Sequence, residues 1–86
     1  MNSSSDHTLL HALARRVRRL RRAKEWSREE LARRCGLSVR FLARVESGDG
    51  NISVLRLESL ARALETTPDR LVRPATQEFK IGRAHV

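Results

Sequence analysis

The side chains in this sequence best suited to chemistry are arginines. Arg40 and Arg44 are four residues apart, so in a helix their guanidinium groups would project from one face. A guanidinium can donate two parallel hydrogen bonds to a phosphate, to a carboxylate or to the O6 and N7 atoms of guanine. The pattern predicts a surface that binds an anion. The alternative is that both arginines are simply solvated.

Residue patterns for catalysis or metal binding are missing from the sequence. Cys35 is the single cysteine, so it cannot form an internal disulfide, and with three scattered histidines it gives no metal-ligand spacing. His7 and His11 are one helical turn apart, but they lie near a chain end that we expect to fray. No Ser/His/Asp, Cys/His or paired-carboxylate arrangement and no phosphate loop occurs. We therefore expect no enzyme, no metal and no cofactor.

Two short helices joined by a tight turn are predicted over residues 27–47. Ser27 followed by Glu30 has the spacing of a capping box, and Ser38 is the expected N-cap of the second helix. Gly36 would end the first helix, because glycine adopts the positive φ of a C′ residue without a steric penalty. This arrangement is typical of a helix-turn-helix unit, whose second helix can enter the major groove of DNA.

Apolar residues recur at helical spacing along most of the chain, which predicts an all-α fold. A first helix is expected over residues 7–24 with Asp6 as its cap, and a last short helix over residues 67–72 with Pro68 in its first turn. The predicted core faces comprise Leu10, Leu13, Val17 and Leu20; Leu31, Ala32 and Cys35; Phe41, Leu42 and Val45; and Val54, Leu57, Leu60, Ala61 and Leu64. The outward face of the second short helix would be Val39, Arg40, Ala43 and Arg44.

Size and charge narrow the class of partner. The 86 residues leave room for one domain, and 18 Lys and Arg against 10 Asp and Glu give a formal net charge of +8. Such a surface attracts polyanions, with nucleic acid first and an anionic membrane second. Aromatic residues make up only 3%, which argues for duplex DNA over single strands bound by stacking. No apolar run is long enough for a membrane span or a signal peptide, so the simplest inference is a cytoplasmic protein that binds no membrane.

Several short motifs together resemble the phage-repressor/Cro family, also called the XRE family, over about residues 9–72. They are Val17-x-x-Leu20-Arg21, Ser27-x-x-Glu30-Leu31-Ala32, Gly36-Leu37-Ser38 and Val45-Glu46-Ser47-Gly48. The resemblance implies a compact five-helix lambda-repressor-like DNA-binding domain that acts as a homodimer on a two-fold-symmetric operator. It also implies that Arg21 pairs with Glu46 beneath the recognition helix, as a structural contact.

The same resemblance implies which residues meet DNA. Matching positions would set Ser38, Val39, Arg40 and Arg44 at base edges. Phosphate contacts are expected from Arg28 and from residues near the loop after the second short helix. The complete predicted set is Arg28, Ser38, Val39, Arg40, Ala43, Arg44, Ser47 and Asn51. For Arg28 the alternative is an exposed cation placed unfavourably against the helix dipole.

The expected function is that of a sequence-specific regulator of transcription that binds double-stranded DNA, most often as a repressor. An antitoxin-type or other protein-interaction module of the same fold, whose DNA binding is autoregulatory, is the alternative. Weak association with a membrane surface through the arginine-rich first helix is a third reading.

The chain ends are interpreted separately. We expect a flexible N-terminus over residues 1–6, the helix-turn-helix domain over 7–73 and a tail or linker over 74–86. Residues 81–86 look like the translation of a sequencing adapter, so the natural protein is expected to continue beyond about residue 79. Residues 45–55 are similar to regulators of aromatic-compound catabolism, which carry a C-terminal shikimate-kinase-like domain that senses an aromatic acyl-CoA. An effector could therefore act through a missing C-terminal domain.

Overall fold

The computed structural model describes residues 3–73, and over this range it contains five helices and no strand. They are α1 (Ser3–Ala23), α2 (Arg28–Cys35), α3 (Val39–Glu46), α4 (Val54–Ala63) and α5 (Pro68–Val72). The all-α, five-helix architecture is confirmed. The predicted tail, including the adapter-like residues 81–86, lies outside the described residues, as do the side chains of the first seven residues.

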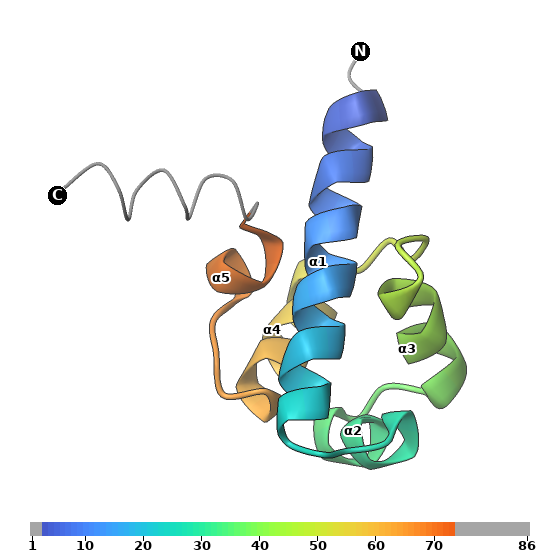
Figure 1. Ribbon diagram of the computed structural model, residues 1–86, viewed down its shortest axis with the longest axis vertical. Helices are drawn as coiled ribbons and strands as arrows, with labels where there is room; N and C mark the ends of the chain where they lie inside the picture. Colours follow the sequence, from blue (N-terminus) through green and yellow to red (C-terminus); the bar gives the residue numbers. More distant parts are fainter. Residues whose placement is uncertain (1–2, 74–86) are drawn as a thin grey trace, which may run out of the picture.

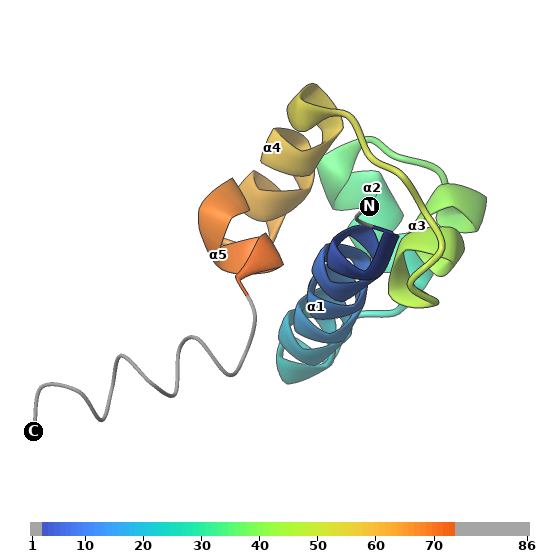
Figure 2. The ribbon, with the colours of Figure 1, turned by 90° about the horizontal axis from the view of Figure 1, so that it is seen from above.

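The long helix α1 organises the arrangement. It packs against α3 on one side and α5 on the other, while α2 packs against α3 and α4. Figures 1 and 2 show α1 flanked by these two helices, with α2 and α4 behind it. None of the described helices is both long enough and apolar enough to cross a bilayer.

The predicted apolar faces meet in one core. Its buried members are Leu13, Val17, Leu31, Cys35, Leu42, Val45, Leu60, Ala61, Leu64 and Leu71. Phe41 and Leu57 are partly buried against it. Two assignments were wrong: Val54, in the first turn of α4, is 77% exposed, and Leu10 is only half-buried and lies outside this core.

The start of α1 also differs from the expectation. The helix begins at Ser3, whereas the sequence placed its first residue after Asp6. Ser and Asp are accepted at the N-cap and in the first turn, where the backbone N–H groups have no partner within the helix. A run of such residues therefore does not specify which of them begins the helix. Asp6 is the one nearest to the apolar repeat, but the helix already begins at Ser3.

Serine caps begin the three helices that follow α1. The hydroxyls of Ser27, Ser38 and Ser53 each accept a hydrogen bond from the backbone N–H three residues later, at 3.0, 3.0 and 3.2 Å. The capping box at Ser27 is only half formed, however. The Glu30 carboxylate does not return to the cap but accepts from Arg34 Nε at 2.6 Å and from Arg33. Arginines one turn further along outcompete the backbone N–H for this carboxylate.

The turns on either side of α3 depend on glycine for different reasons. Gly36 ends α2 with φ of +78°, and Gly48 has φ of +83° in the loop after α3, as the sequence predicted. Gly50 does not have a positive φ. A Cβ at Gly50 would instead lie 3.1 Å from the backbone nitrogen of Val45, so this glycine allows the loop to pass directly over α3. The loop is thereby held against the end of α3.

Candidate nucleic-acid interface

Helix α3 presents one face to the core and the other to solvent. Leu42, Val45 and Glu46 are buried, whereas Ser38, Val39, Arg40 and Arg44 are exposed and Ala43 is half-buried. Val39 is 37% exposed. Within residues 3–73, Arg40 and Arg44 make no ion pair. The face that the sequence predicted to be outward is therefore open, with two uncompensated guanidinium groups.

A buried carboxylate fixes the inner side of α3. Glu46 is 2% exposed, and its two oxygens accept from Arg21 Nε at 2.6 Å and Arg21 Nη2 at 2.9 Å. Arg21 also donates to the carbonyl oxygen of Trp26 at 2.8 Å. This two-bond geometry joins α1 to α3 and confirms the pairing implied by the resemblance.

Two further arginines converge on the same residue. Arg28 Nε lies 3.0 Å from Glu46 Oε1, and Arg18 donates to the Glu46 carbonyl oxygen. Arg28 is therefore not only an exposed cation at the start of α2, because it shares the Glu46 carboxylate with Arg21. Its predicted contact to phosphate remains a prediction, and the side chain is still 42% exposed. No local sequence signal could have shown these contacts, since they join residues of α1 and α2 to the end of α3.

The electrostatics of this cluster favour the charged state throughout. Burial alone would raise the pKa of the Glu46 carboxyl, but the hydrogen bonds and charges of Arg21 and Arg28 outweigh it and lower the pKa. The hydrogen bonds that Arg21 donates to Glu46 raise the pKa of Arg21 in turn, against the effect of its own burial. One carboxylate thus faces two guanidinium groups, which leaves net positive charge at the base of α3.

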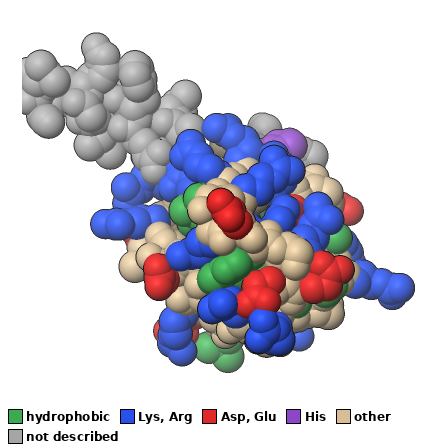
Figure 3. All heavy atoms as spheres, turned by 60° about the horizontal axis from the view of Figure 1, so that its bottom comes forward, with side chains coloured by type: hydrophobic (Ala, Val, Ile, Leu, Met, Phe, Trp, Pro, Cys, Tyr) green, Lys and Arg blue, Asp and Glu red, His purple; other side chains and the backbone are tan. Residues whose placement is uncertain are grey.

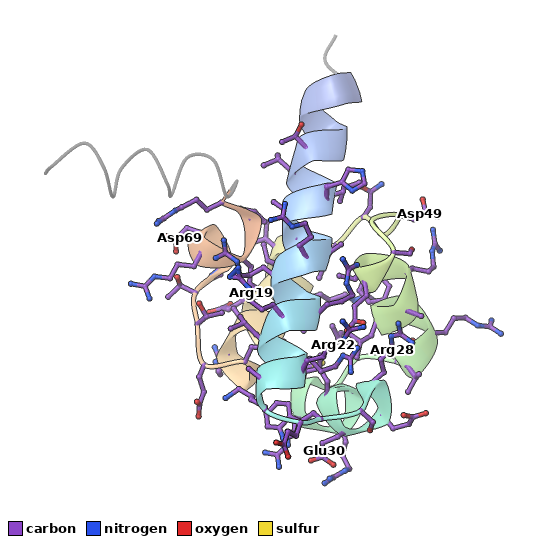
Figure 4. The ribbon with its side chains drawn as sticks, viewed as in Figure 1. Arg19, Arg22, Arg28, Glu30, Asp49 and Asp69 are labelled. Atoms are coloured by element: carbon purple, nitrogen blue, oxygen red, sulfur yellow. The ribbon has the colours of Figure 1, made fainter. Side chains whose placement is uncertain are left out.

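The two residues predicted to contact phosphate in the loop after α3 differ in whether their hydrogen-bond donors are already in use. The Ser47 hydroxyl donates to the carbonyl oxygen of Arg44 at 2.8 Å, and the Ser47 backbone N–H also bonds to α3. A phosphate contact from Ser47 would require one of these bonds to be exchanged. Asn51 is exposed on the far side of Gly50. Figure 4 shows Asp49 in this loop and Arg28 next to α3.

The lower end of the molecule, around α2, carries charges of both signs. Figure 3, in which the lower end of the molecule in Figure 1 comes forward, shows Lys and Arg interspersed with Asp and Glu. Helix α2 itself pairs Glu30 with Arg33 and Arg34. Mixed charge of this kind contributes little attraction for a polyanion, so the unpaired arginines of α3 stand out. Cys35 adds no reactivity, because burial raises the pKa of its thiol.

The comparisons with known proteins agree with this geometry. A family model described as helix-turn-helix matches residues 17–71, which include all of α2, α3 and α4. The chain belongs to the XRE-type helix-turn-helix family. It is 36% identical over 76 residues to a hypothetical transcription factor of Neisseria meningitidis, covering 88% of this chain and 72% of that protein. It is also 41% identical over 64 residues to an uncharacterized helix-turn-helix-type transcriptional regulator, y4dJ, of Sinorhizobium fredii, covering 74% and 82%.

Solved structures show the same helix-turn-helix fold. The crystal structure of the Neisseria transcription factor NHTF superposes with a TM-score of 0.78 at 37% identity, over 85% of this chain and 84% of that one. The restriction-modification controller protein C.AhdI of Aeromonas hydrophila gives a TM-score of 0.68 at 39% identity, over 72% and 94%. The family consists of DNA-binding regulators of transcription, which are not enzymes.

Proposed function

We propose that this helix-turn-helix protein recognises duplex DNA by laying α3 in the major groove, with α2 across the backbone. The observation that carries the proposal is the open outer face of α3, where Arg40 and Arg44 have no ion-pair partner among the described residues. Each could bond the O6 and N7 atoms of a guanine, a contact worth roughly 1–3 kcal/mol of discrimination. Val39 offers only an apolar surface, suited to a thymine methyl group.

The contacts around α3 support this role by making it rigid. A side chain that reads bases must be held in register with the groove, and the Arg21–Glu46 bonds attach α3 to α1 from behind. Arg28 has only its Nε engaged with Glu46, so its terminal amino groups remain for a phosphate. The proposed base-facing surface also includes Ser38, at the start of α3, and Ala43, which is half-buried on the same helix. The proposed phosphate-facing surface also includes Ser47 and Asn51.

Binding-site selection from random duplexes tests base reading directly. The wild type should select a consensus, and Arg40→Ala should relax that consensus at one or two positions while other positions persist. Arg62→Ala is the matched control, because Arg62 is also an exposed helical arginine and lies on α4. A uniform loss of affinity with an unchanged consensus would show that Arg40 contacts a phosphate, and an unselective wild type would refute sequence-specific reading.

We also propose that the protein acts as a homodimer and represses transcription by occupying its operator. Val54 and Leu55 support dimerisation, since two adjacent apolar side chains at 77% and 75% exposure are a surface that a second copy could cover. The DNA-binding domain in this proposal is residues 7–73, followed by a tail or linker. A promoter fusion carrying the selected site, assayed with and without the protein, tests the direction of regulation.

A further inference from the structure

A hollow of about 330 Å³ lies on the outer surface of α1, where that helix approaches the end of α5. Apart from Ala12 it is lined by arginines alone: Arg15, Arg16, Arg18, Arg19, Arg22 and Arg73. Figure 4 shows Arg19 on the side of α1 that faces α5 and Arg22 on the side toward α3, so the hollow extends across the outward surface of α1. None of the residues predicted to contact DNA lines it, so the predicted DNA-binding set does not account for this concentration of positive charge.

Three of these arginines are held in place by the protein. Arg16 Nη1 donates to the carbonyl oxygen of Arg70 at 2.8 Å, and Arg18 donates to the carbonyl oxygen of Glu46. Arg73 Nη2 lies 3.2 Å from Asp69 Oδ2. These bonds hold three of the side chains that line the hollow, and the Arg73–Asp69 pair neutralises one of their charges.

The other three arginines form a stripe along α1. Arg15, Arg19 and Arg22 follow one another at four- and three-residue steps and are exposed, and none has an ion pair within residues 3–73. Like charges at this spacing repel one another and destabilise the helix slightly. An anion that bridges them would turn this repulsion into attraction.

The shape and lining indicate the class of anion. Six residues of α1 line the hollow and Arg73, directly after α5, closes it at one end, so its size suits a compact ligand. No aromatic side chain lines the hollow, so no base or ring could stack there, and Ala12 is its only apolar wall. Guanidinium groups bind phosphate oxygens through paired, charge-assisted hydrogen bonds. Arg15, Arg19 and Arg22 extend over about two turns of α1, which is longer than one phosphate group can bridge.

We propose that this hollow binds a compact ligand with two or more linked phosphate groups. The phosphates lie along the stripe formed by Arg15, Arg19 and Arg22, with the anchored arginines on either side. The site is separate from the proposed DNA surface, and Arg18 is the side chain that connects the two. Linked phosphates also occur in DNA, so the experiment must distinguish a small ligand from flanking duplex.

Calorimetric titration of the full chain with inorganic tripolyphosphate, and separately with a mixed-sequence duplex, makes this distinction. Arg19→Gln and Arg40→Gln form a matched pair, since each removes one exposed guanidinium from a helix. We expect Arg19→Gln to weaken tripolyphosphate binding about tenfold and to leave duplex binding unchanged. Arg40→Gln should do the reverse. Arg15→Gln provides a second test of the stripe, and circular dichroism checks that each variant is folded.

Other outcomes would overturn the proposal. Equal weakening of tripolyphosphate binding by Arg19→Gln and Arg40→Gln would show a diffuse attraction of anions to a basic protein. Loss of duplex affinity in Arg19→Gln, without a matching loss for tripolyphosphate, would assign the hollow to DNA. Orthophosphate binding as tightly as tripolyphosphate would contradict the requirement for linked phosphates.

Discussion

Glu46 connects three helices although it belongs to only one of them. Its carboxylate accepts from Arg21 of α1 and Arg28 of α2, and its carbonyl oxygen accepts from Arg18 of α1. A carboxylate this well buried would be strongly destabilising without partners, and here each oxygen has at least one charged donor. The consequence is that the position of α3 is fixed by charge as well as by apolar packing.

Replacing Glu46 with Gln should therefore destabilise the fold strongly. The change keeps the size of the side chain but leaves Arg21, which is 9% exposed, without a counter-charge. We expect a loss of roughly 3–5 kcal/mol in the free energy of unfolding, measured by urea denaturation near neutral pH. Glu58→Gln is the control, because the Glu58–Arg62 pair at 3.3 Å is exposed and should contribute no more than about 0.5 kcal/mol. Equal losses in both variants would contradict this account of Glu46.

The same pair predicts how stability depends on pH. The pKa of Glu46 is lower in the folded protein than its ordinary value of 4.5, so ionised Glu46 stabilises the fold above that value. This contribution should be lost as the pH falls below 4.5 and through the lowered pKa. Thermal unfolding between pH 7 and pH 3 measures this contribution, as the gap in unfolding temperature between the wild type and Glu46→Gln at each pH. The gap should narrow in acid, and a constant gap would mean that Glu46 stays protonated or contributes through shape alone.

At the scale of elements, the sequence was most informative about helix ends, where serine at an N-cap and glycine after the last turn each have a well-defined structural role. Ser27 and Ser38 cap helices as predicted, and Gly36 ends α2. Local rules did not determine where α1 begins or whether Val54 is covered, because both depend on what lies beyond the element. The outward face of α3 could be predicted from the apolar stripe of that helix. The contact between Arg28 and Glu46 could not be predicted in this way, since it depends on how α2 and α3 cross.

Two helix ends use glutamate where glycine would be less strained. Glu25 and Glu65 have φ of +60° and +61°. Each lies just after a helix, and its own backbone N–H and that of the next residue donate to carbonyl oxygens of the last helical turn. Left-handed backbone costs an ordinary residue roughly 1–2 kcal/mol, whereas glycine adopts it freely but loses more entropy on folding. The two effects leave a net advantage for glycine at such a position.

We accordingly expect Glu25→Gly to stabilise the protein by up to about 1 kcal/mol. Glu25 is the better of the two positions to test, because Glu65 also pairs with Lys24 at 3.0 Å. Thermal unfolding of Glu25→Gly beside Glu29→Gly makes the comparison. Glu29 is an exposed residue within α2, so the same substitution there should destabilise by about 1 kcal/mol. Loss of stability in both variants would show that the strain at Glu25 is absent in solution.

At the scale of the whole molecule, the net charge of +8 includes two groups of arginines to which we assign different proposed roles. Arg40 and Arg44 lie on α3, and the arginine stripe lies on the outward surface of α1. Charge attracts DNA at long range but does not place a protein at one site, which requires contacts in register with the groove. Two copies related by a two-fold axis would double those contacts at a fixed spacing. In the proposed dimer, the surface that joins the two copies would thus matter as much as the surface proposed to read the bases.

The apolar pair at the start of α4 predicts how that assembly can be broken. Leu55→Glu places a carboxylate in the first turn of a helix, where the dipole favours it, so folding should be unaffected. In a two-fold dimer the change occurs twice, and burial of each leucine contributes about 1.5–3 kcal/mol. Sedimentation should therefore show a dimer weakened at least tenfold. Leu9→Glu, on α1 at 45% exposure, should leave the dimer intact. If Leu55→Glu remains dimeric and keeps its operator affinity, the two copies meet through some other surface.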